Sequence, residues 1–117
     1  MQSFKNIQVW QKSHDITLEI YQLTKEFPNE EKFGLTSQMR RSAASIPTNI
    51  AEGSGRGSDA DFARFLQYSM GSASELEYQL ILAKDLGYLP LEKYIQINPQ
   101  ITEIKRMLTG FLKRLRK

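Results

Sequence analysis

The sequence predicts an all-α protein in which residues 1–117 form one domain, an up-down-up-down four-helix bundle. Apolar residues recur every three or four positions through four segments, which is the spacing of amphipathic helices. No segment alternates apolar and polar residues for more than a few positions, so we expect no strand. The connections between the segments are short, which favours antiparallel neighbours, and 117 residues suffice for one hydrophobic core.

The first helix is expected to run from about Val9 to Phe27. Pro28 and Asn29 end it, because the residue before a proline avoids the helical region. One face carries the apolar positions, which are Val9, Ile16, Ile20, Leu23 and Phe27.

The second helix is expected to begin near Phe33 and to contain a proline, Pro47. A proline inside a helix removes one hydrogen bond, clashes with the carbonyl four residues earlier, here that of Ala43, and costs about 3 kcal/mol. Because Ile46 and Ile50 continue the apolar face, we expect a kinked but continuous helix whose Ala43 carbonyl accepts from a side chain or water. The apolar positions are Leu35, Met39, Ala43, Ile46 and Ile50.

The third helix is expected to be long, with Ser58 or Asp59 as its N-cap, Leu86 near its end and Gly87 as its stop. Its apolar face also carries small residues, within the run 69–74, that match another small run at 42–45 in the second helix. We therefore expect these two helices to approach closely at mid-bundle. The face consists of Phe62, Leu66, Ser69, Ala73, Leu76, Leu80 and Ala83.

The fourth helix has the most regular apolar spacing, and Pro90 is expected in its first turn. Its positions alternate in steps of three and four, and are Tyr94, Ile97, Ile101, Ile104, Leu108, Phe111 and Leu115. Further apolar side chains lie beside these faces and predict a homo-oligomer, because some of them need another subunit to cover them. They are Ile95, Met107, Leu112, Tyr21, Tyr68, Tyr78 and Tyr88.

The residues that carry catalytic chemistry are scarce. His14 is the only histidine and cysteine is absent, so we expect no catalytic residue, no metal site, no cofactor and no enzymatic activity. The glycine-rich run 53–58 follows a helix and lacks the lysine of a phosphate loop, so we interpret it as a helix stop and turn. The alternative is a weak phosphate site at its exposed N–H groups and Arg56.

Several charged residues lie near the small-residue positions where helices two and three meet. An isolated buried charge is costly, so we expect them to form internal ion pairs. Arg40 or Arg41 is predicted to pair with one of three carboxylates, those of Glu52, Glu75 and Glu77.

The basic side chains concentrate at the C-terminal end of a chain whose net charge is +3. Residues 105–117 hold no acidic side chain, which favours a polyanionic partner such as RNA or DNA. The alternative is that these cations only complement a helix C-terminus. The predicted phosphate-contacting residues are Lys105, Arg106, Lys113, Arg114, Arg116 and Lys117, with Arg56 and Arg64 in addition.

The cellular compartment is predicted from what the sequence lacks. A chain without cysteine fits a reducing cytoplasm, and the longest apolar runs are only a few residues, too short to cross a bilayer. The opening MQSFKNIQVW has no signal-peptide core. We expect a cytoplasmic protein that does not contact the membrane.

Three stretches, FKNIQVWQKSHDI, FGLTSQMRRSAASIPTNIAEGSGR and DFARFLQYSMGSASELEYQLILAKDLGYL, resemble the bacterial four-helix bundle family of ribosomal RNA intervening-sequence proteins. The resemblance implies a left-handed bundle that assembles as a homo-oligomer, commonly a pentamer. Some relatives are similar to the accessory variability determinant of diversity-generating retroelements, which implies nucleic acid and a reverse transcriptase as partners.

Together these observations predict a non-enzymatic, homo-oligomeric nucleic-acid-binding or ribonucleoprotein accessory module that binds the phosphate backbone electrostatically. The alternative is a homo-oligomeric protein-interaction scaffold without nucleic-acid binding.

Overall fold

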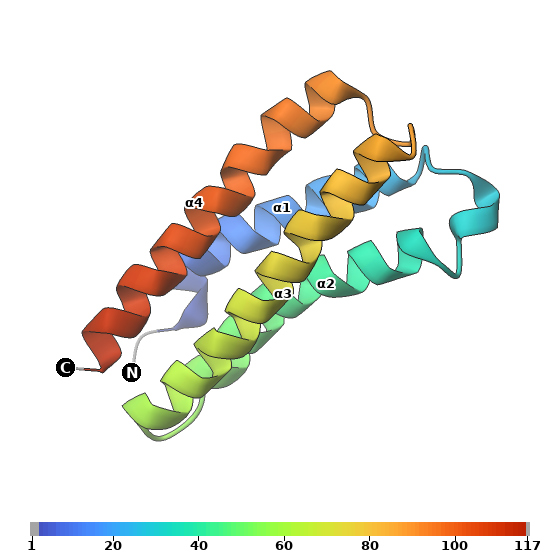
Figure 1. The fold of residues 1–117 in the computed structure, drawn as a ribbon. Helices are drawn as coiled ribbons and strands as arrows, with labels where there is room; N and C mark the ends of the chain where they lie inside the picture. Colours follow the sequence, from blue (N-terminus) through green and yellow to red (C-terminus); the bar gives the residue numbers. More distant parts are fainter. Residues whose placement is uncertain (1–2, 117) are drawn as a thin grey trace.

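Four helices form the fold, in the order that the apolar periodicity predicts. The computed structural model describes residues 3–116, and in this range all regular structure is helical. The helices are α1 (Gln8–Thr24), α2 (Leu35–Ser54), α3 (Asp59–Asp85) and α4 (Leu91–Leu115), with two single 3-10 turns, η1 (Phe4–Asn6) and η2 (Asn29–Glu31). Successive helices run in opposite directions and form an up-down-up-down bundle (Figure 1). It measures 44 × 24 × 20 Å.

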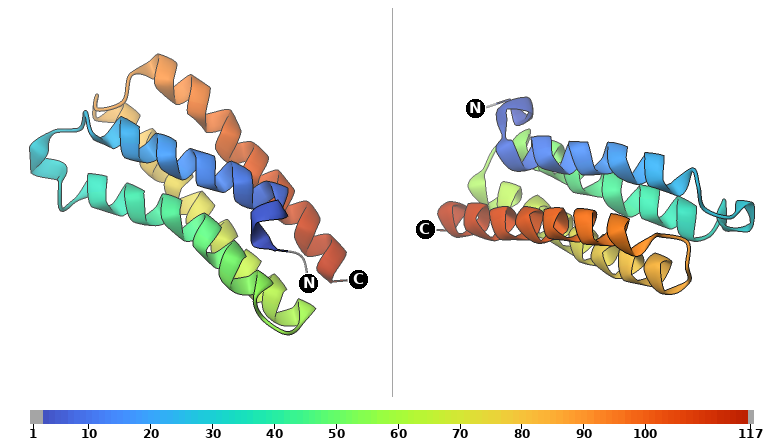
Figure 2. Two further views of the ribbon diagram at one scale, coloured as in Figure 1. Left: turned by 180° about the vertical axis from the view of Figure 1, so that it is seen from behind. Right: turned by 90° about the horizontal axis from the view of Figure 1, so that it is seen from above.

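The ends of the bundle differ in the segments that they bring together. The described N-terminal turn, the α2–α3 connection and the last turn of α4 lie at one end (Figures 1 and 2). The α1–α2 and α3–α4 connections lie at the opposite end. Within residues 3–116 no helix combines the length and hydrophobicity that crossing a bilayer requires.

The connection between α1 and α2 departs from the sequence prediction. Helix α1 ends at Thr24 because the chain tightens into i→i+3 hydrogen bonds before Pro28, such as the one from the Phe27 N–H to the Thr24 carbonyl at 3.1 Å. Phe27 is still buried. Helix α2 begins at Leu35, two residues later than predicted, and the Phe33 side chain outside it is 90% exposed.

Pro47 lies within a continuous α2, as predicted. The Ala43 carbonyl, which loses its helical donor to the proline, accepts a hydrogen bond from the Thr17 hydroxyl of α1 at 3.0 Å. The Ser69 hydroxyl of α3 donates to the neighbouring Ile46 carbonyl at 2.8 Å. Both hydroxyl groups are buried. The Thr17 hydroxyl therefore supplies the donor that Pro47 removes, which confirms the expected compensation, and the Ser69 hydroxyl adds a second bond next to the proline.

The small residues of α2 and α3 meet as predicted. Ala43 on α2, and Ser69 and Ala73 on α3, have no exposed surface. Farther along, a Cβ added to Gly53 would approach the Phe65 Cβ to 2.8 Å, so glycine allows the end of α2 to lie against α3.

The ends of α3 follow the predicted signals. The Ser58 side chain caps the helix by accepting from the Asp61 N–H at 3.1 Å. Gly87 ends it with a φ of +81°, a conformation that glycine adopts readily. Pro90 occupies the N-cap of α4 and not its first turn.

Helix α4 also contains a proline in its interior, Pro99, whereas the sequence pattern predicts an interior proline only in the second helix. Pro99 lies about two turns after the start of α4 and removes the hydrogen bond to the Ile95 carbonyl. Ile95 and Pro99 both lie on an exposed part of the helix, where water can reach the backbone.

The core consists largely of the predicted apolar positions. On α4, however, Leu112 is buried while Phe111 and Leu115 are only half-buried. A pattern repeating every 3.5 residues drifts by roughly 20° per heptad on a straight α-helix, so the buried side moves by about one position along α4. Of the side chains outside these faces, Tyr21, Tyr68, Tyr78 and Ile95 are 41%, 47%, 60% and 60% exposed.

Candidate nucleic-acid interface

The basic residues near the C-terminus share one end of the bundle with the α2–α3 connection. Arg56 lines a hollow together with Phe111 and Leu115 of α4. Arg64 lines a second groove together with Arg116. Folding thus brings the α2–α3 connection and the last turn of α4, two distant segments that carry predicted cations, to one end of the bundle (Figure 2).

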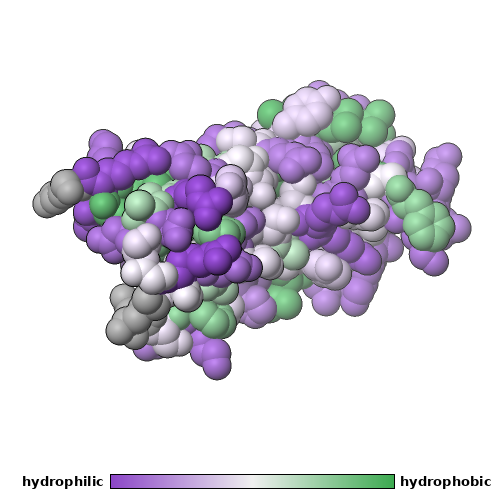
Figure 3. Space-filling model, turned by 90° about the horizontal axis from the view of Figure 1, so that it is seen from below, coloured by the Kyte–Doolittle hydropathy of each residue, from purple (hydrophilic) through white to green (hydrophobic). Residues whose placement is uncertain are grey.

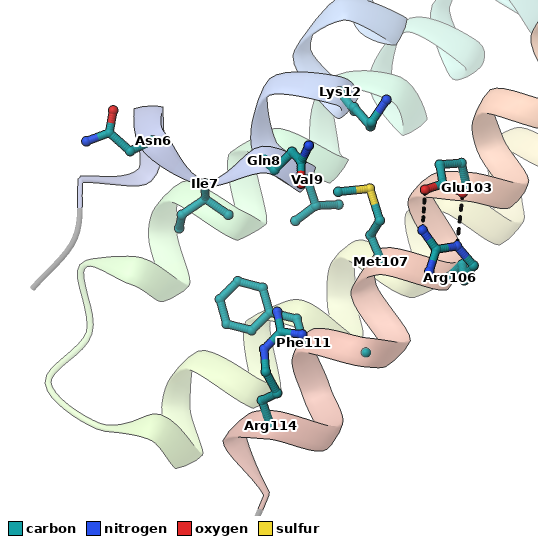
Figure 4. A pocket seen from close by; sticks show the side chains of 11 residues that line it. Asn6, Ile7, Gln8, Val9, Lys12, Glu103, Arg106, Met107, Phe111 and Arg114 are labelled. Atoms are coloured by element: carbon teal, nitrogen blue, oxygen red, sulfur yellow. Dashed lines mark hydrogen bonds and ion pairs between the residues drawn. The ribbon is translucent and has the colours of Figure 1, made fainter.

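A third hollow at this end lies between the start of α1 and the last turns of α4, with a volume of about 710 Å³ (Figure 4). Lys12 of α1 lies on one side, and Arg106 and Arg114 of α4 on the other. The remaining lining residues are Asn6, Ile7, Gln8, Val9, Glu103, Met107, Gly110 and Phe111. We call this hollow the α1–α4 groove.

Lys12 was not among the predicted binding residues. It precedes the basic run by more than ninety positions and faces that run only because α1 and α4 lie antiparallel (Figure 1). No short-range signal in the sequence reveals this pairing.

Half of the predicted binding residues hold acidic partners. The Lys105 ammonium lies 2.9 Å from Glu77 on α3, and Arg106 binds Glu103 one turn away. Arg56 lies 3.7 Å from Glu52, and Arg64 lies 3.2 Å from Asp61. The basic run 105–117 contains no acidic residue of its own, yet it is partly neutralised in the folded protein. Glu77 of α3 pairs with Lys105, and Glu103, one turn earlier on α4, pairs with Arg106.

The pKa directions agree with these pairs. Hydrogen bonds from Arg106 lower the pKa of Glu103, and the positive charges of Arg106 and Lys12 add to this effect. The pKa of Arg106 is raised in turn by Glu103. Hydrogen bonds to Tyr68 and Asp61 raise the pKa of Arg64. Glu103, Arg106 and Arg64 are therefore charged near neutral pH.

The last turn of α4 keeps cations without acidic partners among the described residues. Lys113, Arg114 and Arg116 are exposed. The Arg114 guanidinium lies over the Phe111 ring, 5.1 Å from its centroid. Gln67 on α3, with its amide oxygen turned to α4, accepts from Arg116 at 3.0 and 3.2 Å. Lys117 lies outside the described residues.

The predicted ion pairs of Arg40 and Arg41 are wrong. Among residues 3–116 neither pairs with Glu52, Glu75 or Glu77. Glu52 faces a neighbouring turn of its own helix and Glu77 faces α4, whereas Glu75 and Arg41 are exposed.

Arg40 instead contacts the C-terminal end of α1. Its guanidinium lies over the Tyr21 ring at 4.7 Å, and it donates to the Thr24 hydroxyl at 2.8 Å and to the Tyr21 carbonyl at 3.3 Å. A cation is favourable there, because the last carbonyls of a helix lack partners and carry partial negative charge.

The part of the chain that the structure describes contains no group of three or more His, Cys, Asp and Glu side chains placed to hold a metal ion. The His14 ring stacks on Trp10, with centroids 5.1 Å apart and planes 4° apart.

The chain is similar to known proteins over most of its length. The model of the 23S rRNA-intervening sequence protein family matches residues 5–110. The chain belongs to this family. A solved structure with 37% sequence identity and a TM-score of 0.83 covers 90% of this chain and 95% of its own. It is a protein of unknown function from the S23 ribosomal protein family of Bacteroides thetaiotaomicron. No curated protein matches the chain.

The family match confirms the resemblance that the sequence motifs indicate. Neither description names a catalytic activity. The match ends at residue 110, so Lys113, Arg114 and Arg116 lie beyond the part of the chain that it covers.

Proposed function

We propose that this member of the 23S rRNA-intervening sequence protein family is a non-enzymatic, homo-oligomeric nucleic-acid-binding module that acts as a ribonucleoprotein accessory in the cytoplasm. The observation that carries the proposal is the gathering of cations at one end of the bundle, where Lys113, Arg114 and Arg116 lack acidic partners among the described residues. The family description names ribosomal RNA without stating that these proteins bind it, so RNA is the first ligand to test.

The binding mode follows from the kind of contact that these side chains offer. Exposed Lys and Arg side chains neutralise phosphates and release counterions, so affinity falls steeply with salt and depends little on sequence. Lys105 is the exception among the predicted residues, since its ion pair with Glu77 is only about one-third exposed on both sides. We expect it to stabilise the contact between α3 and α4 more than it binds phosphate.

Homo-oligomerisation would multiply this basic end around a symmetry axis, which raises avidity without any new contact. Exposed apolar side chains support a second copy as the partner, and Figure 3 shows apolar patches emerging between hydrophilic side chains on one face. The large ones are Leu18, Tyr21, Phe33, Tyr68, Tyr78, Leu86, Leu91 and Ile95. A pentamer and a reverse transcriptase partner follow from the family resemblance and stay predictions.

A homo-oligomeric scaffold without nucleic-acid binding is the second candidate. The observation that favours it is the pairing of Arg56, Arg64, Lys105 and Arg106 with nearby carboxylates, which leaves fewer cations for phosphate. In this alternative the last cations of α4 only complement the helix dipole.

Light scattering on a size-exclusion column, followed by binding of a labelled RNA across a salt series, tests the proposal. We expect a mass well above the 13.5 kDa of one chain. Neutralising Lys113, Arg114 and Arg116 to Gln should weaken binding equally for unrelated sequences. It should also lower the slope of log Kd against log salt by about 2, at roughly 0.7 per lost phosphate contact.

The matched control removes the same charge from the opposite end of the bundle. Lys25, Lys32 and Lys93 are exposed there, and their replacement by Gln should change affinity little. A parent protein that binds no RNA at low salt supports the scaffold instead. A triple variant of α4 that binds like the parent would place the interface elsewhere.

A further inference from the structure

Gly110 is a glycine inside α4 that the packing of this chain does not require. A helix-interior glycine costs about 1 kcal/mol relative to alanine. A Cβ added to Gly110 would meet only the Arg114 guanidinium, at an ordinary contact distance of 3.8 Å. Gly110 lines the α1–α4 groove, so its missing side chain keeps this part of the groove open.

The groove is open but not neutral. Lys12, Arg106 and Arg114 line it with Glu103 as the acidic member of the lining. Arg106 engages Glu103 through its Nε at 3.0 Å and through a second nitrogen. Lys12 and Arg114, both exposed, are left on opposite sides of the groove (Figure 4). This arrangement suits an anion between the two helices.

The groove also offers a planar surface and an apolar one. The Arg114 guanidinium lies over the Phe111 ring, whose edge contacts Phe62 with ring centroids 5.1 Å apart. Unpaired bases stack on guanidinium planes and aromatic rings. Met107 adds apolar surface beside Gly110. A volume of about 710 Å³ lies within the roughly 300–1,000 Å³ usual for small-molecule sites.

We propose that the α1–α4 groove binds a nucleotide of single-stranded nucleic acid, with a base at the Arg114–Phe111 stack and Gly110, and a phosphate at Lys12. The proposal rests on the proposed function and refines it. A duplex keeps its bases stacked and presents only its backbone, so it would contact the exposed cations of the last turn without entering the groove. Single strands and duplexes should therefore depend on different residues.

The test compares a labelled single-stranded oligouridylate with a labelled blunt-ended RNA duplex of equal phosphate number, by fluorescence anisotropy at one salt concentration. Gly110→Gln fills the groove without changing charge, and Lys12→Gln removes its cation. Gly110→Gln should weaken single-strand binding on the order of tenfold, the effect expected for losing one stacked base. Lys12→Gln should weaken it severalfold by removing one phosphate contact, and it should also lower the salt dependence. Neither should change duplex binding by more than about twofold. An oligothymidylate arm distinguishes RNA from DNA.

The chain supplies matched controls for both changes. Gly71 is an interior glycine of α3 with no atom within 4 Å of an added Cβ, and it lies outside the groove lining. Lys25 is an exposed lysine beyond the far end of α1. Gly71→Gln and Lys25→Gln should leave both affinities unchanged. Circular dichroism verifies that each variant folds, and light scattering on a size-exclusion column verifies that it assembles. If Gly110→Gln does not fold, Lys12→Gln still tests the proposal, because Lys12 is exposed and its replacement does not disturb the core.

The outcomes separate this proposal from the proposed function. If Lys12→Gln and Gly110→Gln bind the single strand like the parent while the triple variant of α4 loses both ligands, the groove proposal is overturned and the proposed function stands. If the parent binds neither ligand, both are overturned. Equal losses for single strand and duplex also overturn the groove proposal, because they indicate backbone contact alone.

Discussion

Replacing Thr17 by valine should reveal how the bundle accommodates Pro47. Valine keeps the shape of threonine and removes the hydroxyl that donates to the Ala43 carbonyl at 3.0 Å. Thr17 and Ala43 are both buried, so the carbonyl would be left without a partner. An unsatisfied buried acceptor costs about 1–3 kcal/mol, and we expect Thr17→Val to lower the free energy of unfolding by about 1.5 kcal/mol.

The same change should be nearly neutral once the proline is gone. In Pro47→Ala the residue at position 47 regains an N–H that can donate to the Ala43 carbonyl along the helix. The single hydroxyl proton of Thr17 is shared with the Ser13 carbonyl, whose oxygen lies 2.8 Å away. The Ser13 carbonyl lies inside α1 and keeps its helical N–H donor in both backgrounds, so losing this share costs little. A double-mutant cycle should therefore give a coupling of about 1–2 kcal/mol between Thr17 and Pro47.

Urea unfolding of the four proteins at one fixed concentration measures this coupling, since oligomerisation makes stability concentration-dependent. Thr102→Val is the control, because Thr102 makes a similar bond to the Asn98 carbonyl on an exposed face. It should change stability by less than about 0.5 kcal/mol in either background. Equal penalties for Thr17→Val with and without Pro47 would refute the compensation that we infer.

Two further predictions concern the glycines and the pH dependence of stability. Gly110→Ala should stabilise the fold by about 1 kcal/mol, whereas Gly53→Ala, whose Cβ would lie 2.8 Å from its nearest neighbour, should cost about 1–3 kcal/mol, both measured by urea unfolding. Hydrogen bonds from the Leu35 N–H and the Tyr88 hydroxyl lower the pKa of Glu31 from its ordinary 4.5. The folded state then binds this proton less readily than the unfolded chain, so the stability that Glu31 contributes is present above pH 4.5 and is lost as the pH falls through its lowered pKa. Glu31→Gln should show a smaller loss of stability on acidification than the parent, and an identical pH profile would contradict this.

Apolar periodicity predicts most of the core because burial requires only that a helix present one consistent face. Ile16, Met39, Leu76 and Ile101, one from each helix, are fully buried as expected. The prediction from periodicity is less accurate at the end of α4, where Leu112 is buried and the predicted Phe111 and Leu115 are only half-buried. A strict 3-4 spacing cannot reveal this shift, because it depends on how the real helix winds.

The polar contacts were less predictable, because a partner on another helix leaves no local trace in the sequence. The Ala43 carbonyl was expected to find a donor, yet nothing in the sequence identifies Thr17, on a different helix, as that donor. Arg40 was assigned a carboxylate, yet the end of α1 provides carbonyls and a ring that satisfy it. The sequence shows which side chains are charged and on which helix they lie, but it does not show which groups on other helices they contact.

The seams between helices differ in a way that explains where a ligand site can form. At the α2–α3 contact, small residues such as Ala43 and Ala73 are fully buried and leave no room. The α1–α4 pair is the one that no direct connection joins, and it packs less extensively than the other neighbouring pairs. Long side chains, among them Lys12 and Arg106, line that seam, and two hollows lie along it. Because the α2–α3 seam around Pro47 is closely packed, an open and charged seam between α1 and α4 is compatible with a well-packed core.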